Sequence, residues 1–266
     1  MTANYIKRIE IESLWSGHRH VVWDLSPDVN ILSGVNGVGK TTILRRSIEG
    51  LLPQSPSPGV HLTFDIEEAD CVRYDVVHSF DRPLMHSETL TRVTDAVLMT
   101  ELDWQLYQLQ RRYLDYQVNV SNRILALFTS GVADAQEQAQ QMAASKTEFF
   151  DIVDDLFRET GKTIDRTSNE IVFMQYGETL QPYQLSSGEK QMLVILLTVL
   201  VQDNQHYTLF MDEPEISLHI EWQQRLIALV RRLNPNAQII LTTHSPALIM
   251  NGWQDAVTDV EDIVRG

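Results

Sequence analysis

Residues 34–41 read Gly34-Val35-Asn36-Gly37-Val38-Gly39-Lys40-Thr41, which matches the pattern G-x-x-x-x-G-K-[ST]. A short apolar run, 29–32, precedes this stretch, and residues 40–50 follow it with apolar side chains at helical spacing. The sequence therefore predicts a strand, a glycine-rich loop and a helix in succession. In such a loop the backbone N–H groups turn toward a phosphate, and the start of the helix adds its positive dipole. A glycine-rich turn that binds no nucleotide is the alternative.

The side chains of this loop have separate roles in phosphate binding. Lys40 can reach the β- and γ-phosphate oxygens, and the Thr41 hydroxyl can bind Mg²⁺. The backbone around them supplies N–H donors. The predicted nucleotide-binding residues are Asn36, Gly37, Val38, Gly39, Lys40, Thr41 and Thr42.

Two carboxylates follow a second apolar strand, which we predict for residues 206–211. Asp212 and Glu213 come directly after this strand, where ligands bind in open α/β sheets. We expect Asp212 to orient Mg²⁺ through water and Glu213 to polarise the attacking water. The alternative is that both carboxylates only cap the following helix. The phosphate-binding pattern in the same chain favours the catalytic role.

Residues 185–191 read Leu-Ser-Ser-Gly-Glu-Lys-Gln and precede an apolar helix predicted for 188–203. Ser186 and Glu189 form a capping-box pattern, which by itself predicts only a well-formed helix start. The same helix start can bind an anion such as the γ-phosphate of a nucleotide. The candidate contacts are Ser186, Ser187, Gly188 and Glu189.

A histidine follows a further apolar strand, predicted for residues 237–242. His244 lies in the stretch Thr-Thr-His-Ser at 242–245. Its imidazole can donate a hydrogen bond to a γ-phosphate or to the attacking water near pH 7. A single histidine at a strand end is more often structural, and here the other three motifs favour a catalytic role.

The composition narrows the class of protein. The chain has 266 residues, 21 Lys and Arg against 36 Asp and Glu, and a formal net charge of −15. A single cysteine and an N-terminus without a signal-peptide pattern indicate a cytoplasmic protein. The longest apolar run, residues 192–201, is half of the roughly 20 residues that span a bilayer, so we expect no membrane span. The acidic balance argues against non-specific DNA binding, although a local basic surface could still bind DNA.

Hydrophobic periodicity predicts an α/β fold. Residues 8–23 open the chain with a sheet, and residues 60–80 are typical of an antiparallel strand pair. Apolar spacings of three and four predict one helix from 101 to 130 and another from 135 to 161, together an antiparallel hairpin. Strands and helices then alternate, which indicates a largely parallel sheet.

Taken in order, these motifs resemble the ABC-type ATPase family. The resemblance covers nearly the whole chain and implies a P-loop NTPase with an ABC-ATPase-like mixed sheet, an N-terminal antiparallel β part and an inserted helical hairpin. It also implies one module, with a nucleotide-binding core at 1–86 and 162–266 and a helical subdomain at 87–161. The motifs are the loop from Gly34, the Leu-Ser-Ser-Gly-Glu segment from Leu185, the acidic stretch from Leu209, Ser217-Leu218-His219 and the Thr-Thr-His-Ser segment from Thr242.

The resemblance implies how the site is assembled. Two ATP molecules would lie in a head-to-tail homodimer that ATP binding closes and hydrolysis opens. Residues 186–188 of one subunit would complete the site of the other. The half-site within one subunit would consist of Lys40, Thr41, Asp212, Glu213 and His244.

The details resemble the SMC-, RecF- and OLD-like (AAA_21-type) branch, which occurs in DNA repair and anti-phage defence. Ser187 replaces the second glycine of the transporter motif LSGGQ, and His219 stands at the aspartate of SALD. The predicted hairpin, at about 30 residues per arm, would reach roughly 45 Å instead of forming a long coiled coil. Few residues follow His244, so we expect no Toprim nuclease domain here and a separate effector protein, a nuclease or toxin.

Several expectations stay open from the sequence. A nucleotide-binding subunit of an ABC transporter and a non-hydrolysing ATP-gated scaffold are the alternatives to a regulatory ATPase. Gln105 and Gln108 are candidates for the loop glutamine that senses Mg²⁺. Trp15, His18 and Arg19 precede the phosphate loop, where the family often places nucleotide contacts, but a core tryptophan is equally consistent with Trp15.

Overall fold

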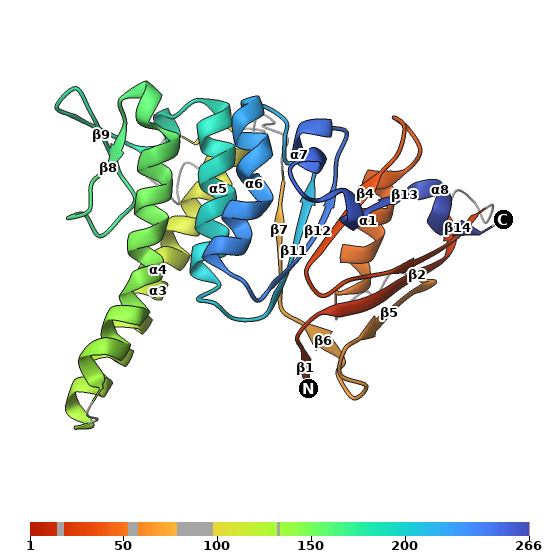
Figure 1. Cartoon of the computed structure of the whole chain (residues 1–266), viewed down its shortest axis with the longest axis horizontal. Coiled ribbons are helices and arrows are strands. Elements are labelled where there is room, and N and C mark those ends of the chain that lie inside the picture. The colour runs from red at the N-terminus through yellow and green to blue at the C-terminus, as the bar shows by residue number, and fades with distance from the viewer. Residues whose placement is uncertain (15–18, 53–57, 79–97, 132–133, 266) are drawn as a thin grey trace. The chain divides into compact units, whose positions relative to one another are not determined.

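The computed structural model describes residues 1–14, 19–52, 58–78, 98–131 and 134–265, and the chain divides into two compact units (Figure 1). Trp15, His18 and residues 87–97 of the predicted insertion lie outside the described residues. The second unit extends past the predicted boundary at 161. The first unit comprises Met1–Ser79, Asn204–Arg231 and Pro235–Gly266, and the second comprises Phe80–Asp203 and Arg232–Asn234.

The first unit is built on a five-stranded parallel sheet, as predicted. Its strand order is β13-β4-β12-β11-β7. Every residue of β12 is buried, which is typical of a parallel sheet that is covered on both faces. The strands are β4 (Val29–Ser33), β7 (Tyr74–Val77), β11 (Tyr207–Asp212), β12 (Ala237–Thr242) and β13 (Val257–Asp259).

The first unit also contains a four-stranded antiparallel sheet, with strand order β14-β3-β2-β5. Half-buried and exposed residues alternate along β5, and the central strands contribute Ile9, Ile11 and Trp23 to the core. The predicted N-terminal antiparallel part is therefore confirmed. The strands are β2 (Ile6–Leu14), β3 (Arg19–Asp24), β5 (Val60–Phe64) and β14 (Val264–Arg265).

The strand pair predicted for residues 60–80 is wrong. β5 pairs antiparallel with β2, whereas β7 pairs parallel with β11 in the other sheet. Between them, β6 (Cys71–Val72) pairs parallel with β1 (Thr2–Ala3). A period of two shows that a segment is extended and half-buried, but the pattern does not encode which strand it will join.

The helix α1 (Lys40–Gly50) contacts strands of both sheets, β2 and β5 of one and β11 and β12 of the other (Figure 1). Its apolar face is closed in the shared core, where Ile43 is 0% exposed and Leu44 is 3% exposed. Phe210 of β11 and Ile240 of β12 belong to the same core. This packing fixes the start of α1 next to the carboxyl end of β4.

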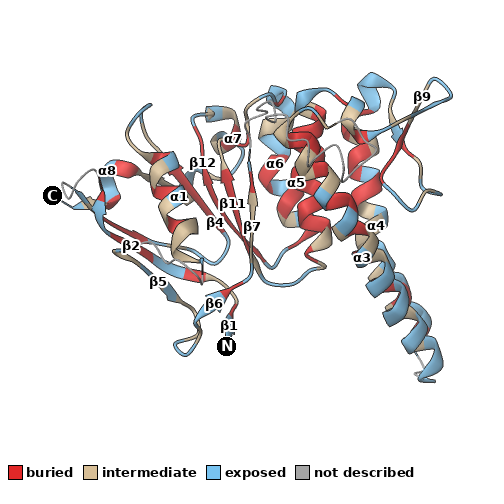
Figure 2. Ribbon diagram, turned by 180° about the vertical axis from the view of Figure 1, so that it is seen from behind, coloured by how far each residue is buried: buried red, intermediate tan, exposed pale blue. Residues whose placement is uncertain are grey.

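The second unit contains the predicted helical hairpin. α3 (Glu101–Thr129) and α4 (Ala135–Leu156) pack against one another, and α5 (Ser187–Val201) contacts both. Figure 2 shows that the far end of α3 is exposed, while the part near α5 is buried. At about 1.5 Å per residue, α3 is roughly 44 Å long, in agreement with the predicted arm.

Short elements connect these helices and close the chain. A three-stranded antiparallel sheet, β10-β9-β8, is formed by the segment of chain that runs from α4 to α5. Among the described ranges, no helix is both long and apolar enough to cross a membrane. The remaining elements are η1 (Arg158–Thr160), β8 (Thr163–Ile164), β9 (Phe173–Gln175), β10 (Glu178–Leu180), η2 (Pro182–Gln184), α6 (Ile220–Leu233), α7 (Pro246–Met250), η3 (Gln254–Ala256) and α8 (Val260–Ile263).

Candidate active site

Three parallel strands of the first unit end at the same edge of the sheet and bring the predicted residues together. Leu32 of β4, Thr242 of β12 and Asp212 of β11 are in register at the ends of neighbouring strands. The glycine loop follows β4, His244 follows β12, and Glu213 follows β11. Motifs far apart in the sequence therefore meet where ligands bind in open α/β sheets.

The glycine loop has the backbone conformation of a phosphate cradle. Gly34, Gly37 and Gly39 have φ angles of 148°, 81° and 107°, which glycine adopts at little cost. A Cβ atom at Gly37 would meet no other atom within 4 Å, so the φ angle alone requires glycine there. Gly39 precedes α1 and provides no side-chain cap. The first N–H groups of α1 are therefore available to an anion, and the loop fits a nucleotide phosphate.

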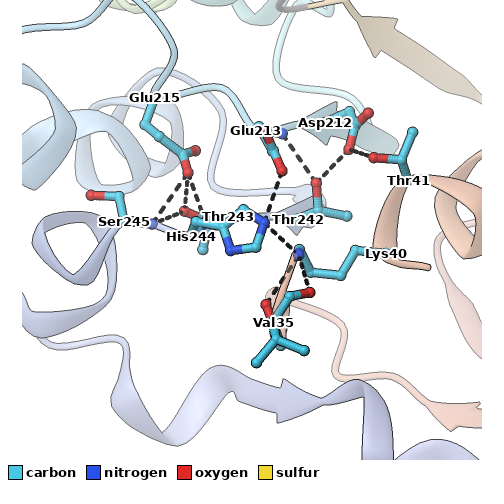
Figure 3. A network of polar contacts seen from close by, with 11 residues as sticks. Val35, Lys40, Thr41, Asp212, Glu213, Glu215, Thr242, Thr243, His244 and Ser245 are labelled. Atoms are coloured by element: carbon cyan, nitrogen blue, oxygen red, sulfur yellow. Dashed lines mark hydrogen bonds and ion pairs between the residues drawn. The ribbon is translucent and has the colours of Figure 1, made fainter. Parts of the chain in front are cut away.

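Lys40 is a buried cation at the centre of the loop, only 4% exposed. Its Nζ donates hydrogen bonds to the carbonyl oxygens of Gly34 (3.1 Å) and Val35 (3.3 Å), and lies 2.5 Å from Nε2 of His244 (Figure 3). Burial lowers the pKa of Lys40, an effect that neighbouring carboxylates partly oppose. No carboxylate of the described residues lies within ion-pair distance of this ammonium group. A phosphate would place a negative charge directly against this ammonium group.

Asp212 and Thr41 place two oxygen atoms together at the end of β11. Oδ1 of Asp212 accepts hydrogen bonds from Thr242 Oγ1 (2.5 Å) and from Thr41 Oγ1 (3.1 Å) (Figure 3). Within the described ranges, no group of three or more His, Cys, Asp or Glu side chains could by itself hold a metal. Mg²⁺ does not need such a group, because it keeps several waters and binds through one or two protein oxygens plus phosphate. The pair Thr41 and Asp212 fits that smaller requirement.

Glu213 has a φ angle of 47°, in the left-handed region that costs a non-glycine residue about 1–3 kcal/mol. Its N–H is held by Thr242, through both the carbonyl oxygen and Oγ1, each at 3.1 Å. The turn directs the Glu213 carboxylate toward the histidine, and its Oε1 lies 3.1 Å from Nε2 of His244 (Figure 3). Strained backbone of this kind concentrates at active sites.

One nitrogen of His244 is therefore shared by two neighbours. Nε2 can accept a hydrogen bond from the Lys40 ammonium or donate one to Glu213, but a single nitrogen cannot do both at once. The position of the ring proton decides which contact is a hydrogen bond. A negative ligand that binds Lys40 would release Nε2 to donate to Glu213.

Sequence reasoning missed Glu215, the last residue of Asp-Glu-Pro-Glu. Its Oε1 accepts hydrogen bonds from Thr243 Oγ1 (2.5 Å) and from the backbone N–H groups of His244 (2.9 Å) and Ser245 (3.2 Å). The signal in the sequence that could have indicated Glu215 was the additional carboxylate at the end of this motif. Its partner segment lies far along the chain, so the sequence alone could not show the contact.

The Ser186–Glu189 motif belongs to the second unit, at the start of α5. Glu189 is 3% exposed and accepts hydrogen bonds from Ser186 Oγ (2.9 Å), Lys162 Nζ (2.8 Å) and Thr160 Oγ1 (2.9 Å). Burial tends to raise the pKa of Glu189, but these bonds outweigh burial and lower it. The capping box is present, while Ser186 and Ser187 remain exposed and Gly188 is half-buried.

The remaining predicted site residues are exposed or half-buried in the loop, or belong to the second unit. Asn36 is exposed in the loop, and Val38 and Thr42 are half-buried beside it. Gln105 and Gln108 lie within α3 of the second unit, in a helix and not in the loop that the resemblance requires. Neither glutamine therefore lies in a loop, where the resemblance places the glutamine that senses Mg²⁺.

Comparisons with known proteins agree with this arrangement. The model of the family AAA_21, described as "AAA domain, putative AbiEii toxin, Type IV TA system", matches residues 80–251. The chain is 24% identical over 302 residues to Septu protein PtuA of Bacillus thuringiensis, a match that covers 92% of this chain and 72% of PtuA. It is also 24% identical over 112 residues to the Retron Vc95 probable ATPase of Vibrio cholerae serotype O1 biovar El Tor.

The retron match covers 38% of this chain and spans only 22% of that longer relative. Among solved structures, the crystal structure of the SMC head bound to the C-winged helix domain of ScpA is similar with a TM-score of 0.54 and 13% identity. That match covers 93% of this chain and 92% of the SMC head. At this identity the likeness establishes the fold, which is that of a P-loop NTPase.

Proposed function

The chain belongs to the AAA_21 family, and on that premise we propose that it binds ATP and hydrolyses it to ADP and phosphate with Mg²⁺. The observation that carries the proposal is the meeting of Lys40, Asp212, Glu213 and His244 at three adjacent strand ends. Each supplies a different requirement of phosphoryl transfer: a cation, an oxygen ligand, a carboxylate base and a proton donor.

In this proposal the residues act on ATP and one water. The N–H groups of the loop and Lys40 hold the β- and γ-phosphates, and Thr41 and Asp212 would hold Mg²⁺, which offsets phosphate charge when bound. Glu213 accepts a proton as water attacks the γ-phosphorus, and the bond to the β-phosphate oxygen breaks. His244 orients Glu213 through Nε2 or donates to the γ-phosphate.

We further propose that the chain works as a single ATPase module that dimerises around ATP. Ser186, Ser187 and Gly188 lie at an exposed or half-buried helix start, which suits contact with the nucleotide of a second copy. Closure on ATP and opening after hydrolysis would give a partner protein two states to recognise.

The partner we propose is a separate effector, a nuclease or toxin. Similarity to Septu protein PtuA and to a retron ATPase favours anti-phage defence over DNA maintenance as the setting. The net charge of −15 gives no support for a surface that coats DNA. Stimulation of ATP turnover by duplex DNA at low salt, falling as salt is raised, would show that DNA takes part.

The substitution Glu213→Gln tests the proposal. It keeps the size of the side chain but removes the base, so we expect hydrolysis about 100-fold slower or more with ATP still bound. Size-exclusion chromatography with Mg²⁺ and ATP should then show a dimer that retains nucleotide. Glu221→Gln, on the exposed first turn of α6, is the matched control and should behave as the wild type.

Two outcomes contradict parts of the proposal. A Glu213→Gln protein that stays monomeric with ATP and retains no nucleotide excludes the sandwich dimer. A wild type that binds ATP but turns it over no faster than Glu213→Gln supports a non-hydrolysing ATP-gated scaffold instead.

A further inference from the structure

Glu215 is a charged group beside the site to which the proposed hydrolysis assigns no role. One oxygen of its carboxylate, Oε1, accepts three hydrogen bonds, from Thr243 Oγ1 and from the N–H groups of His244 and Ser245 (Figure 3). Its other oxygen, Oε2, is buried without a hydrogen-bond partner in the described residues. All three donors come from one tripeptide, so a single oxygen atom holds the whole segment.

That segment has just left the sheet. The N–H of Thr243 donates to the carbonyl of Leu32 (3.3 Å), which continues the pairing of β12 with β4. The next N–H, of His244, donates to Glu215 instead of to a strand. The N–H of Ser245 is divided between Glu215 and Thr243 Oγ1 (2.9 Å). The backbone that carries the imidazole is thus held by a side chain from the loop after β11.

The chemistry of this contact favours a firm hold. Two successive N–H groups and a hydroxyl form a small concave site for an anion, and the Glu215 carboxylate fills it. Hydrogen bonds to a charged acceptor are shorter and stronger than those between neutral groups. Gln223 adds hydrogen bonds between uncharged groups. Its Oε1 accepts from Ser245 Oγ (2.6 Å), and its Nε2 donates to the Leu218 carbonyl (2.9 Å).

Glu215 also links the two halves of the candidate catalytic pair. It lies two residues after Glu213, on the same turn, and it anchors the backbone of His244, whose Nε2 is 3.1 Å from Glu213 Oε1. Movement of the histidine backbone by about 1 Å away from Glu213 would break that contact, because 3.1 Å is already near the upper end of the roughly 2.7–3.2 Å range of N–H···O hydrogen bonds.

We propose that Glu215 is a positioning residue that holds His244 against Glu213, and that it sets the rate of ATP hydrolysis without touching the nucleotide. The inference rests on the proposed ATPase function. It assigns to the second glutamate of Asp-Glu-Pro-Glu a role distinct from that of the first.

A measurement of the free protein tests the contact without any turnover. Hydrogen exchange of the His244 and Ser245 amides is compared in the full-length wild type, Glu215→Ala and Glu215→Gln, with Glu221→Ala as the surface control. We expect exchange about tenfold faster or more in Glu215→Ala. Glu215→Gln keeps an acceptor oxygen but loses the charge, so its exchange should lie between those of the wild type and Glu215→Ala. The control should stay near the wild-type rate. Unchanged exchange in Glu215→Ala overturns the proposal.

The second measurement is a double-mutant cycle on ATP turnover. Glu215→Ala should lower kcat about tenfold or more while KM for ATP changes by less than about threefold, and Glu215→Gln should recover part of kcat. If Glu215 acts through His244, its loss should add little to a His244→Ala protein. The proposal would be contradicted if the effects of the two substitutions on kcat multiplied in the double variant. It would also be contradicted if kcat of Glu215→Gln were as low as that of Glu215→Ala.

Thermal unfolding of each variant separates positioning from loss of fold. If Glu215→Ala does not fold, Thr243→Val replaces it in both measurements, because it removes one of the three donors and keeps the shape of a buried side chain. Exchange is then read at the His244 amide, because Thr243 Oγ1 also accepts the N–H of Ser245. Faster exchange and lower kcat are again expected, and wild-type values for both overturn the inference. A wild type without turnover would refute the proposed ATPase, while amide exchange would still decide the role of Glu215.

Discussion

Two buried lysines of this protein have opposite surroundings. Lys190, in the second unit, is 8% exposed, and its Nζ lies 2.7 Å from Oδ1 of Asp103, whose side chain is 3% exposed. Lys40, in the first unit, is 4% exposed and contacts two carbonyl oxygens and a histidine nitrogen, with no carboxylate of the described residues at ion-pair distance. One ammonium group has a carboxylate directly against it, and the other has only more distant ones.

The difference separates a structural ion pair from a binding site. Lys190 joins α5 to the first turn of α3, where Asp103 also accepts the N–H of Thr100 (3.1 Å) in the capping box. Lys40 is desolvated with carboxylates nearby but none of the described ones at ion-pair distance, which leaves part of the cost of burial for a ligand to offset. The same substitution at the two lysines should therefore have different consequences, which the first two of three predictions test, while the third concerns another buried charge of the second unit.

The largest effect is expected from Lys190→Met. It leaves the Asp103 carboxylate buried without its partner, so the free energy of unfolding should fall by about 3–5 kcal/mol. Chemical denaturation measures the change. The control is Arg158→Met, which removes an exposed pair with Asp155 worth about 0–1 kcal/mol. Equal losses of unfolding free energy in the two variants would show that the buried Lys190–Asp103 pair contributes no more to stability than an exposed ion pair.

Lys40→Met should affect the ligand and not the fold. We expect ATP to bind about ten- to a hundredfold more weakly, because hydrogen bonds to charged groups contribute about 1.5–3 kcal/mol each. Unfolding free energy should change by less than about 1 kcal/mol, since no carboxylate loses a partner. Titration calorimetry and denaturation on the same sample measure both. Undiminished ATP affinity would refute the phosphate-loop assignment, and a large loss of stability would remove the contrast with Lys190.

The smallest effect concerns acid stability in the second unit. Hydrogen bonds lower the pKa of Glu189 in the folded protein below its ordinary value of 4.5. Folding is therefore favoured by the charged carboxylate above pH 4.5, and that contribution is lost as pH falls through the folded pKa. Unfolding measured below pH 5 should depend less steeply on pH in Glu189→Gln than in the wild type. An identical slope would mean that the Glu189 cluster does not couple proton binding to folding.

Much of the fold could be predicted from local pattern. The strand, glycine loop and helix around residues 34–41 follow from composition and spacing, and the hairpin arms follow from apolar spacing. The prediction of a strand pair at 60–80 failed because apolar alternation does not specify which strand a segment pairs with. The second unit also takes in α5, which contacts both hairpin arms, although the predicted insertion ended at 161.

The candidate site was predictable in part for the same reason. Lys40, Asp212, Glu213 and His244 each lie at or just after the end of an apolar strand, and strand ends of a parallel sheet share an edge. Glu215 was missed because its role depends on the N–H groups of residues 244 and 245, which no local pattern around residue 215 reveals.

By itself the sequence determined which segments are strands, loops and helices and which residues carry phosphate and proton chemistry, because these depend on neighbours within a few positions. The tertiary structure alone decided that Asp212 aligns with Thr242 and Leu32, that Nε2 of His244 lies between Lys40 and Glu213, and that Lys190 has a carboxylate partner. Those contacts depend on strand order, register and helix packing, which arise only when distant parts of the chain exclude water from one another.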